Sequence, residues 1–409
     1  MDARLDPHLH EGDRAVASPA RRWLSVGSAG TRDRAAGHDE GREAALRAVT
    51  GEDPRLLIVF CANTPDPAAV LAGITEVAPG TPLIGCSSTV AIDPDGPRWD
   101  GVVVAALGGA GLSAATGVGR DAATAPQRAG AAAAAGASVL PERAQHVLVL
   151  LADGQVVNHE RILAGAYGVV GASMPYVGGA CSPDLAFGGT YELFGTEVLT
   201  GGVVGAVIES DGPIGEAVGH GWRQVGEPMI VTHSEGGNIY TLDEKPARVA
   251  YLDRLGAPGD AYTDPDAFRD FARTRPIGIR RRSGLEIRDI GSNRFLVEEP
   301  WLRSRGEVPE GGVIWLMEGD ADTGLDAAGD ACGEAAAAVG RPRPLGVFAF
   351  DCIARRRLLG DERSSASVGR MRERSGGAPV AGLSTWGEFA RLRGITGYHN
   401  QTLVVLAVG

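Results

Sequence analysis

The feature that most constrains the fold of this chain is a short strand-and-turn motif that occurs three times, at residues 81–88, 175–182 and 379–385. Each copy has a proline, a few apolar residues suited to a β-strand, a glycine, and then small side chains, most of them hydroxyl or thiol groups. Because glycine has no Cβ, a strand that ends on glycine lets backbone N–H groups approach another molecule closely. The sequence therefore predicts three strand ends that face a common ligand-binding hollow.

The segments that precede the three copies also match one another. Each combines an alanine-rich helix, a linker with proline and a short apolar strand, usually followed by a second helix. The predicted helices and strands are 41–49, 56–61 and 66–77 in the first unit, 127–139, 146–153 and 158–170 in the second, and 327–339 and 345–352 in the third. Strand–helix–strand order with short loops predicts an α/β fold of repeated β-α-β-β units with mixed, largely parallel sheets.

Local signals mark some of these elements clearly. Asp66 as N-cap and Pro67 in the first turn predict where the helix at 66–77 begins. We expect a strand at 23–26 to run into a turn at Gly27. A strand at 101–107 is expected to lie antiparallel to its neighbour, which makes the sheet mixed.

Composition excludes several classes of protein. With 409 residues, of which 44% are hydrophobic, the chain can build the buried cores of two or three domains. A net charge of −12 repels polyanions, so we expect no nucleic acid partner. The 5 cysteines include no Cys-X-X-Cys pair, which indicates free thiols in a reducing compartment and a cytoplasmic location. No apolar run is long enough to span a membrane, and the polar N-terminus lacks a signal peptide's apolar stretch.

The residue pattern of the sequence changes near Gly226, which suggests a domain boundary. We expect a disordered tail over residues 1–20, a first domain over 21–225 and a second domain over 226–409. The arginine-rich stretch 355–374 of the second domain is expected to form an exposed helix and loop, with a basic binding patch as the alternative.

Motifs in both halves are similar to those of a known family. The first half carries them at 57–61, 83–88 and 178–184, and the second half at 350–355, 382–388 and 399–402. In their order and spacing the chain resembles the FIST proteins, which combine a FIST N-terminal and a FIST C-terminal domain. This resemblance implies a sensory role in signal transduction, with amino acids among the proposed ligands. Bacterial relatives often join these domains to output modules. This chain has no residues left for one, so we expect a separate signalling protein as partner.

A receptor for a zwitterion such as an amino acid needs a cation, an anion and neutral hydrogen-bonding groups. The third unit offers Arg355, Glu388, Asn400 and Thr402, the last two facing the same way on a predicted strand. The alternative is that Arg355 and Glu388 form a structural ion pair and Asn400 bonds a neighbouring backbone group. The predicted ligand-binding residues are Gly85, Cys86, Ser87, Ser88, Gly179, Cys181, Ser182, Asp184, Cys352, Arg355, Thr385, Trp386, Gly387, Glu388, Asn400 and Thr402.

We therefore predict a cytoplasmic small-molecule sensor without enzymatic activity. Two other functions stay open. A thiol-dependent enzyme would use Cys86 or Cys181, although no histidine has the spacing or flanking sequence of a partner base. A protein-interaction scaffold would bind a partner without any small molecule. No metal or cofactor is expected, because closely spaced Cys and His ligands and a phosphate-binding glycine motif are missing from the sequence.

Overall fold

The computed structural model describes residues 21–30, 37–138, 143–184, 186–281, 284–291, 301–340, 342–391 and 397–409. The predicted disordered tail over residues 1–20 lies outside this set. None of the helices in these segments has both the length and the apolar character needed to cross a bilayer.

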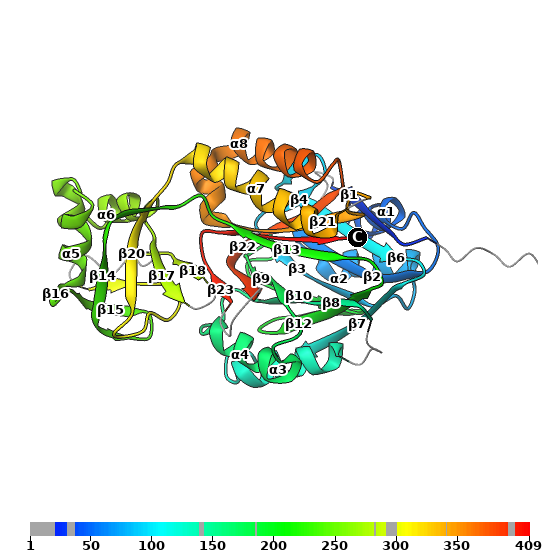
Figure 1. Ribbon diagram of the computed structural model, residues 1–409. Coiled ribbons are helices and arrows are strands. Elements are labelled where there is room, and N and C mark those ends of the chain that lie inside the picture. The colour runs from blue at the N-terminus through cyan, green and yellow to red at the C-terminus, as the bar shows by residue number, and fades with distance from the viewer. Residues whose placement is uncertain are drawn as a thin grey trace, which may run out of the picture.

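The predicted repeat is confirmed as three copies of one β-α-β-α-β-β unit (Figure 1). The first unit contains β1 (Trp23–Ala29), α1 (Gly37–Ala48), β2 (Pro54–Ala62), α2 (Pro67–Val77), β3 (Leu83–Ser88) and β6 (Gly101–Gly108). The second contains β7 (Leu112–Gly119), α3 (Pro126–Ala137), β8 (Gln145–Asp153), α4 (His159–Val170), β9 (Tyr176–Cys181) and β12 (Val203–Ser210). The third contains β13 (Ile214–Gly219), α7 (Ala321–Val339), β21 (Gly346–Cys352), α8 (Ile353–Arg374), β22 (Val380–Arg391) and β24 (Leu403–Val408).

Each unit orders its strands in the same way. The sheets run β1-β6-β2-β3, β7-β12-β8-β9 and β13-β24-β21-β22. Counted in chain order, the second and third strands of every unit are parallel. The fourth strand lies between the first and the second and is antiparallel to both. The sheets are therefore mixed, as predicted, and each parallel pair is joined by a helix.

Short strands join the three units. β10 (Glu192–Phe194) of the second unit pairs with β3 of the first and with β11 (Glu197–Leu199). β4 (Ala91–Asp93) pairs with β22 of the third unit and with β5 (Gly96–Arg98). β22 also pairs with β9 and with β23 (Tyr398–His399). Every unit is thus hydrogen-bonded to the other two.

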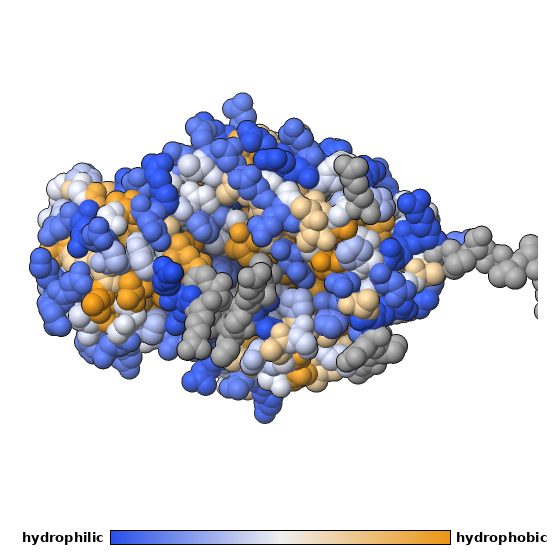
Figure 2. Space-filling model, viewed as in Figure 1, coloured by the Kyte–Doolittle hydropathy of each residue, from blue (hydrophilic) through white to orange (hydrophobic). Residues whose placement is uncertain are grey.

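A further domain is inserted into the third unit between β13 and α7 and lies at the left of Figure 1. It contains β14 (Arg223–Glu235), β15 (Asn238–Leu242), β16 (Lys245–Pro246), α5 (Ala247–Arg254), the 3-10 helix η1 (Gly259–Tyr262), α6 (Pro265–Ala272), β17 (Ile277–Arg281), β18 (Gly284–Arg288), β19 (Leu302–Arg303) and β20 (Val313–Glu318). It has its own hydrophobic core. Figure 2 shows hydrophobic residues on its surface, and its exposed large apolar side chains include Ile230, Val249 and Val313.

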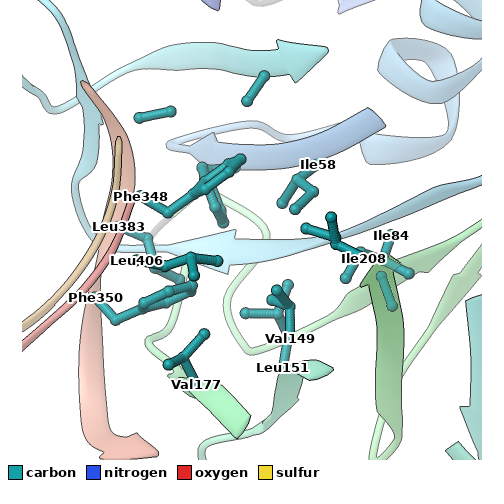
Figure 3. Close-up of a cluster of buried hydrophobic side chains, with 14 of the residues drawn as sticks. Ile58, Ile84, Val149, Leu151, Val177, Ile208, Phe348, Phe350, Leu383 and Leu406 are labelled. Atoms are coloured by element: carbon teal, nitrogen blue, oxygen red, sulfur yellow. The ribbon is translucent and has the colours of Figure 1, made fainter. Parts of the chain in front are cut away.

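The sheets of the three units share one core (Figure 3). Ile58, Val149 and Phe348 occupy the same register position in β2, β8 and β21, and all three are fully buried in one cluster. Alternate residues of these strands point outward, where the helix pairs α1/α2, α3/α4 and α7/α8 cover them. This burial on both faces explains why the strands read as continuous apolar runs.

The repeated glycine has a different role from the one predicted. Gly85, Gly178 and Gly382 are equivalent by strand register, and each lies beside the parallel neighbouring strand. A Cβ on these residues would lie 2.4, 1.8 and 2.0 Å from a backbone carbonyl oxygen of that strand. The glycines therefore permit close strand packing, and the space that a ligand would need is filled by protein.

Two other expectations are tested by the structure. The predicted turn at Gly27 is wrong, because β1 pairs with β6 through to Ala29 and Gly27 lets α1 pack closely on the strand. Most of the arginine-rich stretch forms an exposed helix, as predicted. Arg363, Arg370 and Arg374 of α8 pair with aspartates of α7.

Replacing Gly382 by alanine should destabilise the protein, because the added Cβ would overlap the carbonyl oxygen of Ala349. We expect a loss of at least about 2 kcal/mol in the free energy of unfolding, measured by urea denaturation. The control is Gly168→Ala on the exposed face of α4, where a Cβ meets no atom within 4 Å. That change should stabilise by about 0.5–1 kcal/mol. Equal effects of the two substitutions would contradict the packing role.

Candidate functional site

A cavity of about 450 Å³ lies between the inserted domain and the third unit. Its lining residues come from the start of α8, from β22 and the loop after β23, and from α6 and two loops of the inserted domain. They are Arg269, Asp270, Arg273, Asp289, Ile290, Gly291, Arg305, Cys352, Ile353, Ala354, Arg357, Trp386 and Asn400. The site lies at the carboxyl end of the parallel strand β21, where α/β folds commonly bind ligands.

The cavity carries an excess of positive charge. Among the described residues three of its four arginines pair with aspartates, Arg269 with Asp266, Arg273 with Asp270 and Arg305 with Asp289, which leaves Arg357 without an ion pair. The first turn of α8 also opens into the cavity. This first helical segment is short, because the backbone at Gly360 is not helical, and the Ala354 N–H donates a hydrogen bond to the Cys352 side chain. The cavity is suited to an anionic group because Arg357 lines it.

Asp289 is the negative group deepest in this site. Gln401 Nε2 donates a hydrogen bond to Asp289 Oδ1 at 2.5 Å, and Arg305 Nε lies 3.8 Å from Oδ2. Burial raises the pKa of Asp289, and the Arg305 charge opposes that rise. The negative charge of Asp289 is therefore only partly compensated, and a positively charged group of a ligand would pair with it.

Asn400 is a predicted residue whose polar side chain lines the cavity and is incompletely hydrogen-bonded. It is 1% exposed, and its backbone N–H donates to the carbonyl oxygen of Ile287 at 3.2 Å. Its carboxamide interacts with the phenol of Tyr398, but neither amide atom has a partner of good hydrogen-bond geometry among the described residues. Because an incompletely hydrogen-bonded buried amide is costly, this side chain has bonding capacity left over next to the cavity.

Arg355 and Glu388 do not form the ion pair considered from the sequence. Arg355 Nε donates to Asp351 Oδ1 at 2.7 Å, and Nη2 donates to the Gly324 carbonyl at 3.0 Å. Both Arg355 and Glu388 are fully buried behind the cavity wall. The charges that face the cavity belong to other residues.

Glu388 is held by two threonines that were also predicted for the site. Thr385 Oγ1 donates to Oε1 at 2.5 Å, while the Thr402 backbone N–H and hydroxyl donate to Oε2 at 3.1 and 2.9 Å. Burial raises the pKa of Glu388 to about 8, although these hydrogen bonds act in the opposite direction. Glu388 is therefore a structural acid that retains its proton at neutral pH.

The three predicted strand ends do meet, but they fill the space between them. Ser88 Oγ donates to the Ser384 carbonyl at 3.0 Å, Ser182 Oγ donates to the same oxygen at 2.6 Å, and the two hydroxyls lie 3.3 Å apart. Ser87 Oγ donates to the Ser182 carbonyl at 3.1 Å. This hydrogen-bonded junction joins the three units.

The other predicted residues of the first two units also lie at or near this junction. Asp184 accepts hydrogen bonds from the backbone N–H groups of Thr64 and Ala186 at 2.7 and 2.8 Å. Cys86 and Cys181 are fully buried in the shared core, and burial raises the pKa of Cys181. A Cβ on Gly179 would meet the Thr385 methyl group at 2.4 Å.

Of the sixteen predicted residues, Cys352, Trp386 and Asn400 line the cavity, while Gly387 lies on β22 directly after Trp386. The charged residues of the inserted domain could not be predicted from the sequence, because nothing in their local pattern indicates which face meets α8. Arg357 carried a signal, since it lies in the arginine-rich stretch immediately after a strand end.

Replacing Glu388 by glutamine should change the dependence of stability on pH. The raised pKa means that the folded protein keeps the Glu388 proton up to about pH 8, while the unfolded chain loses it near pH 4.5. The contribution of Glu388 to the free energy of unfolding is complete at low pH. It falls as the pH rises between these two pKa values, by at most about 1.4 kcal/mol per pH unit. Glu388→Gln should therefore gain stability relative to the parent across this range, in urea titrations at several pH values. Parallel pH profiles for the two proteins would contradict this assignment.

Several proteins are similar to this chain. It is 32% identical over 162 residues to an uncharacterized protein of Methanocaldococcus jannaschii, a match that covers 36% of this chain and 30% of that protein. It is 31% identical over 235 residues to an uncharacterized protein of Mycobacterium tuberculosis, covering 55% of this chain and 58% of that protein. The chain thus spans less than two thirds of the length of these relatives.

Solved structures show only weak similarity. Cyanuric acid hydrolase from A. caulinodans aligns with a TM-score of 0.25 and 17% identity, over 46% of this chain and 71% of the hydrolase. T. maritima PurL complexed with ATP aligns with a TM-score of 0.24 and 13% identity, over 95% of this chain and 72% of PurL. Neither score establishes a shared fold.

Family models account for most of the chain. The FIST N domain matches residues 55–245 and the FIST C domain matches residues 248–391. These domains are associated with sensing in signal transduction, in agreement with the motifs noted in the sequence. The protein belongs to the FIST family and contains both of its domains.

Proposed function

We propose that this protein is a sensor that binds a small zwitterionic metabolite of the amino-acid class in the cavity between the inserted domain and the third unit. The observation that carries the proposal is the buried Asn400 carboxamide, which lines the cavity without a well-formed hydrogen bond to the described residues. A ligand would satisfy both its donor and its acceptor.

The charges around the cavity suit the two ends of such a ligand. Its carboxylate would bind Arg357, with Arg305 alongside. Its ammonium group would pair with Asp289, and the Trp386 indole offers apolar contact to its carbon atoms. These residues take over the roles that the sequence analysis gave to Arg355 and Glu388.

The position of the cavity suits a sensory role. Asp289 and Arg305 belong to the inserted domain, while Arg357 and Asn400 belong to the third unit, so a bound ligand would contact both parts. Such a ligand favours the arrangement in which both sets of contacts form. We propose that a separate signalling protein detects this arrangement, as the family's association with signal transduction suggests.

Burial of the thiols supports binding over thiol catalysis. Cys86 and Cys181 are fully buried in the shared core, and burial raises the pKa of Cys181 well above its usual value. A nucleophilic cysteine needs a lowered pKa and access to its substrate. We propose that these thiols serve packing.

Amino acids and related zwitterions should stabilise the protein in a thermal-shift screen, with affinities then measured by calorimetry. Arg357→Ala should weaken binding by about tenfold to a hundredfold, because it removes a charge-assisted contact to the carboxylate. The control is Arg363→Ala, beyond the kink of α8 at Gly360, whose side chain is exposed and pairs with Asp322 outside the cavity. Absence of stabilisation by every compound, with the fold intact, would overturn the proposal.

Asn400→Leu separates a binding role from a structural one. Because the carboxamide has no well-formed hydrogen bond to the described residues beyond its contact with the Tyr398 phenol, its loss should change the stability of the free protein by no more than about 1 kcal/mol. Ligand binding should fall by at least about tenfold. Urea denaturation and calorimetry on the same samples distinguish the two effects. A marked loss of stability with unchanged binding would show that Asn400 is structural.

A further inference from the structure

A second cavity, of about 840 Å³, also has Trp386 in its lining. One wall is the loop after β8 and the first turn of α4 in the second unit, and the other is formed by the β14–β15 turn and segment 303–307 of the inserted domain. The hydrogen bond from the Glu307 backbone N–H to Glu160 Oε1, at 2.9 Å, joins the two walls. This cavity is separate from the α8 end of the site described above.

The two cavities adjoin each other. Trp386 and Arg305 line both of them, and the Arg305 guanidinium carbon lies 5.6 Å from the centre of the Trp386 ring. This pair forms the common wall. Aromatic and guanidinium planes pack well on flat groups such as a peptide amide.

The second cavity also contains an unsatisfied buried group. Ser304 is 6% exposed, lines the cavity, and its Oγ has no hydrogen-bond partner among the described residues. Close to it lies the Gly236–Gly237 turn, and Asn158 precedes α4 without capping it through its side chain. The cavity thus presents both donors and acceptors.

Charges of both signs line this second cavity. The acids are Glu160, Glu235 and Glu307, and the bases are Arg161, Arg303 and Arg305, with His159 beside them. Burial lowers the pKa of His159, so this ring is neutral at pH 7. The mixture contrasts with the arginine excess of the first cavity and suits a ligand that carries polar groups along its length.

We propose that the two cavities form one site for a short peptide, an inference that rests on the proposed sensory function. The peptide carboxylate would bind at Arg357, and a peptide plane would lie against the Trp386–Arg305 pair. The remaining residues would extend into the second cavity toward Ser304 and the acids that accept an ammonium group. A free amino acid would occupy only the first cavity, which leaves Ser304 unsatisfied.

The test compares amino acids with dipeptides and tripeptides that carry the same C-terminal residue. Thermal shift identifies binders, and calorimetry gives their Kd values for the full chain. Peptides should bind at least about tenfold more tightly than the matching amino acid. Amidation of the peptide C-terminus should remove most of the binding, because it removes the carboxylate charge that would pair with Arg357 in the first cavity.

Val157→Trp narrows the second cavity without touching a core, since Val157 is 73% exposed and lines that cavity only. This substitution should abolish the tighter binding of peptides relative to the matching amino acid, and it should leave the affinity for the amino acid unchanged. The matched control is Val169→Trp, at an exposed position of α4 that lines neither cavity.

The outcomes separate this inference from the proposed function. Amino acids that bind as tightly as their peptides, or peptide binding that survives Val157→Trp, would overturn the composite site and leave the sensor proposal in place. If no amino acid or peptide binds the folded protein, both proposals fail.

Discussion

The structure depends on close contact between parallel strands at three equivalent glycines. At Gly85, Gly178 and Gly382 the neighbouring strand's carbonyl group occupies the space where any other residue would place its Cβ. This approach brings the strand ends of all three units together, where Ser88, Ser182 and the Ser384 carbonyl bond to one another. The central junction is therefore dense and holds the units together, which leaves no room for a ligand between the strand ends.

The third unit differs from the second at the end of its central strand. In the second unit, Asp153 accepts hydrogen bonds from Gln155, Thr190 and Gly201 and thereby closes that end. In the third unit the equivalent position is Cys352, and the inserted domain lies over the strand end instead. An internal repeat thus supplies a common scaffold, and the insertion converts one of its edges into a cavity.

The polar groups around the cavity fall into two layers with different roles. Arg355 and Glu388 are paired internally with Asp351, Thr385 and Thr402, so they hold the wall in place. Arg357, Asn400 and Asp289 line the cavity, and the Asn400 carboxamide has no well-formed hydrogen bond to the described residues. A rigid inner layer that leaves an outer layer incompletely satisfied is the arrangement expected of a preformed binding site.

The sequence by itself determined the repeated units, the position of most helices and strands, and the mixed sheets, because apolar periodicity, caps and glycine positions are local properties of the chain. It also indicated Cys352, Trp386 and Asn400. Only the tertiary structure decided that Arg357 faces the cavity while Arg355 is buried, since two residues on a helix point about 200° apart and packing selects the face. It alone brought Asp289 and Arg305 to the site, because contacts between segments far apart in the chain leave no local pattern.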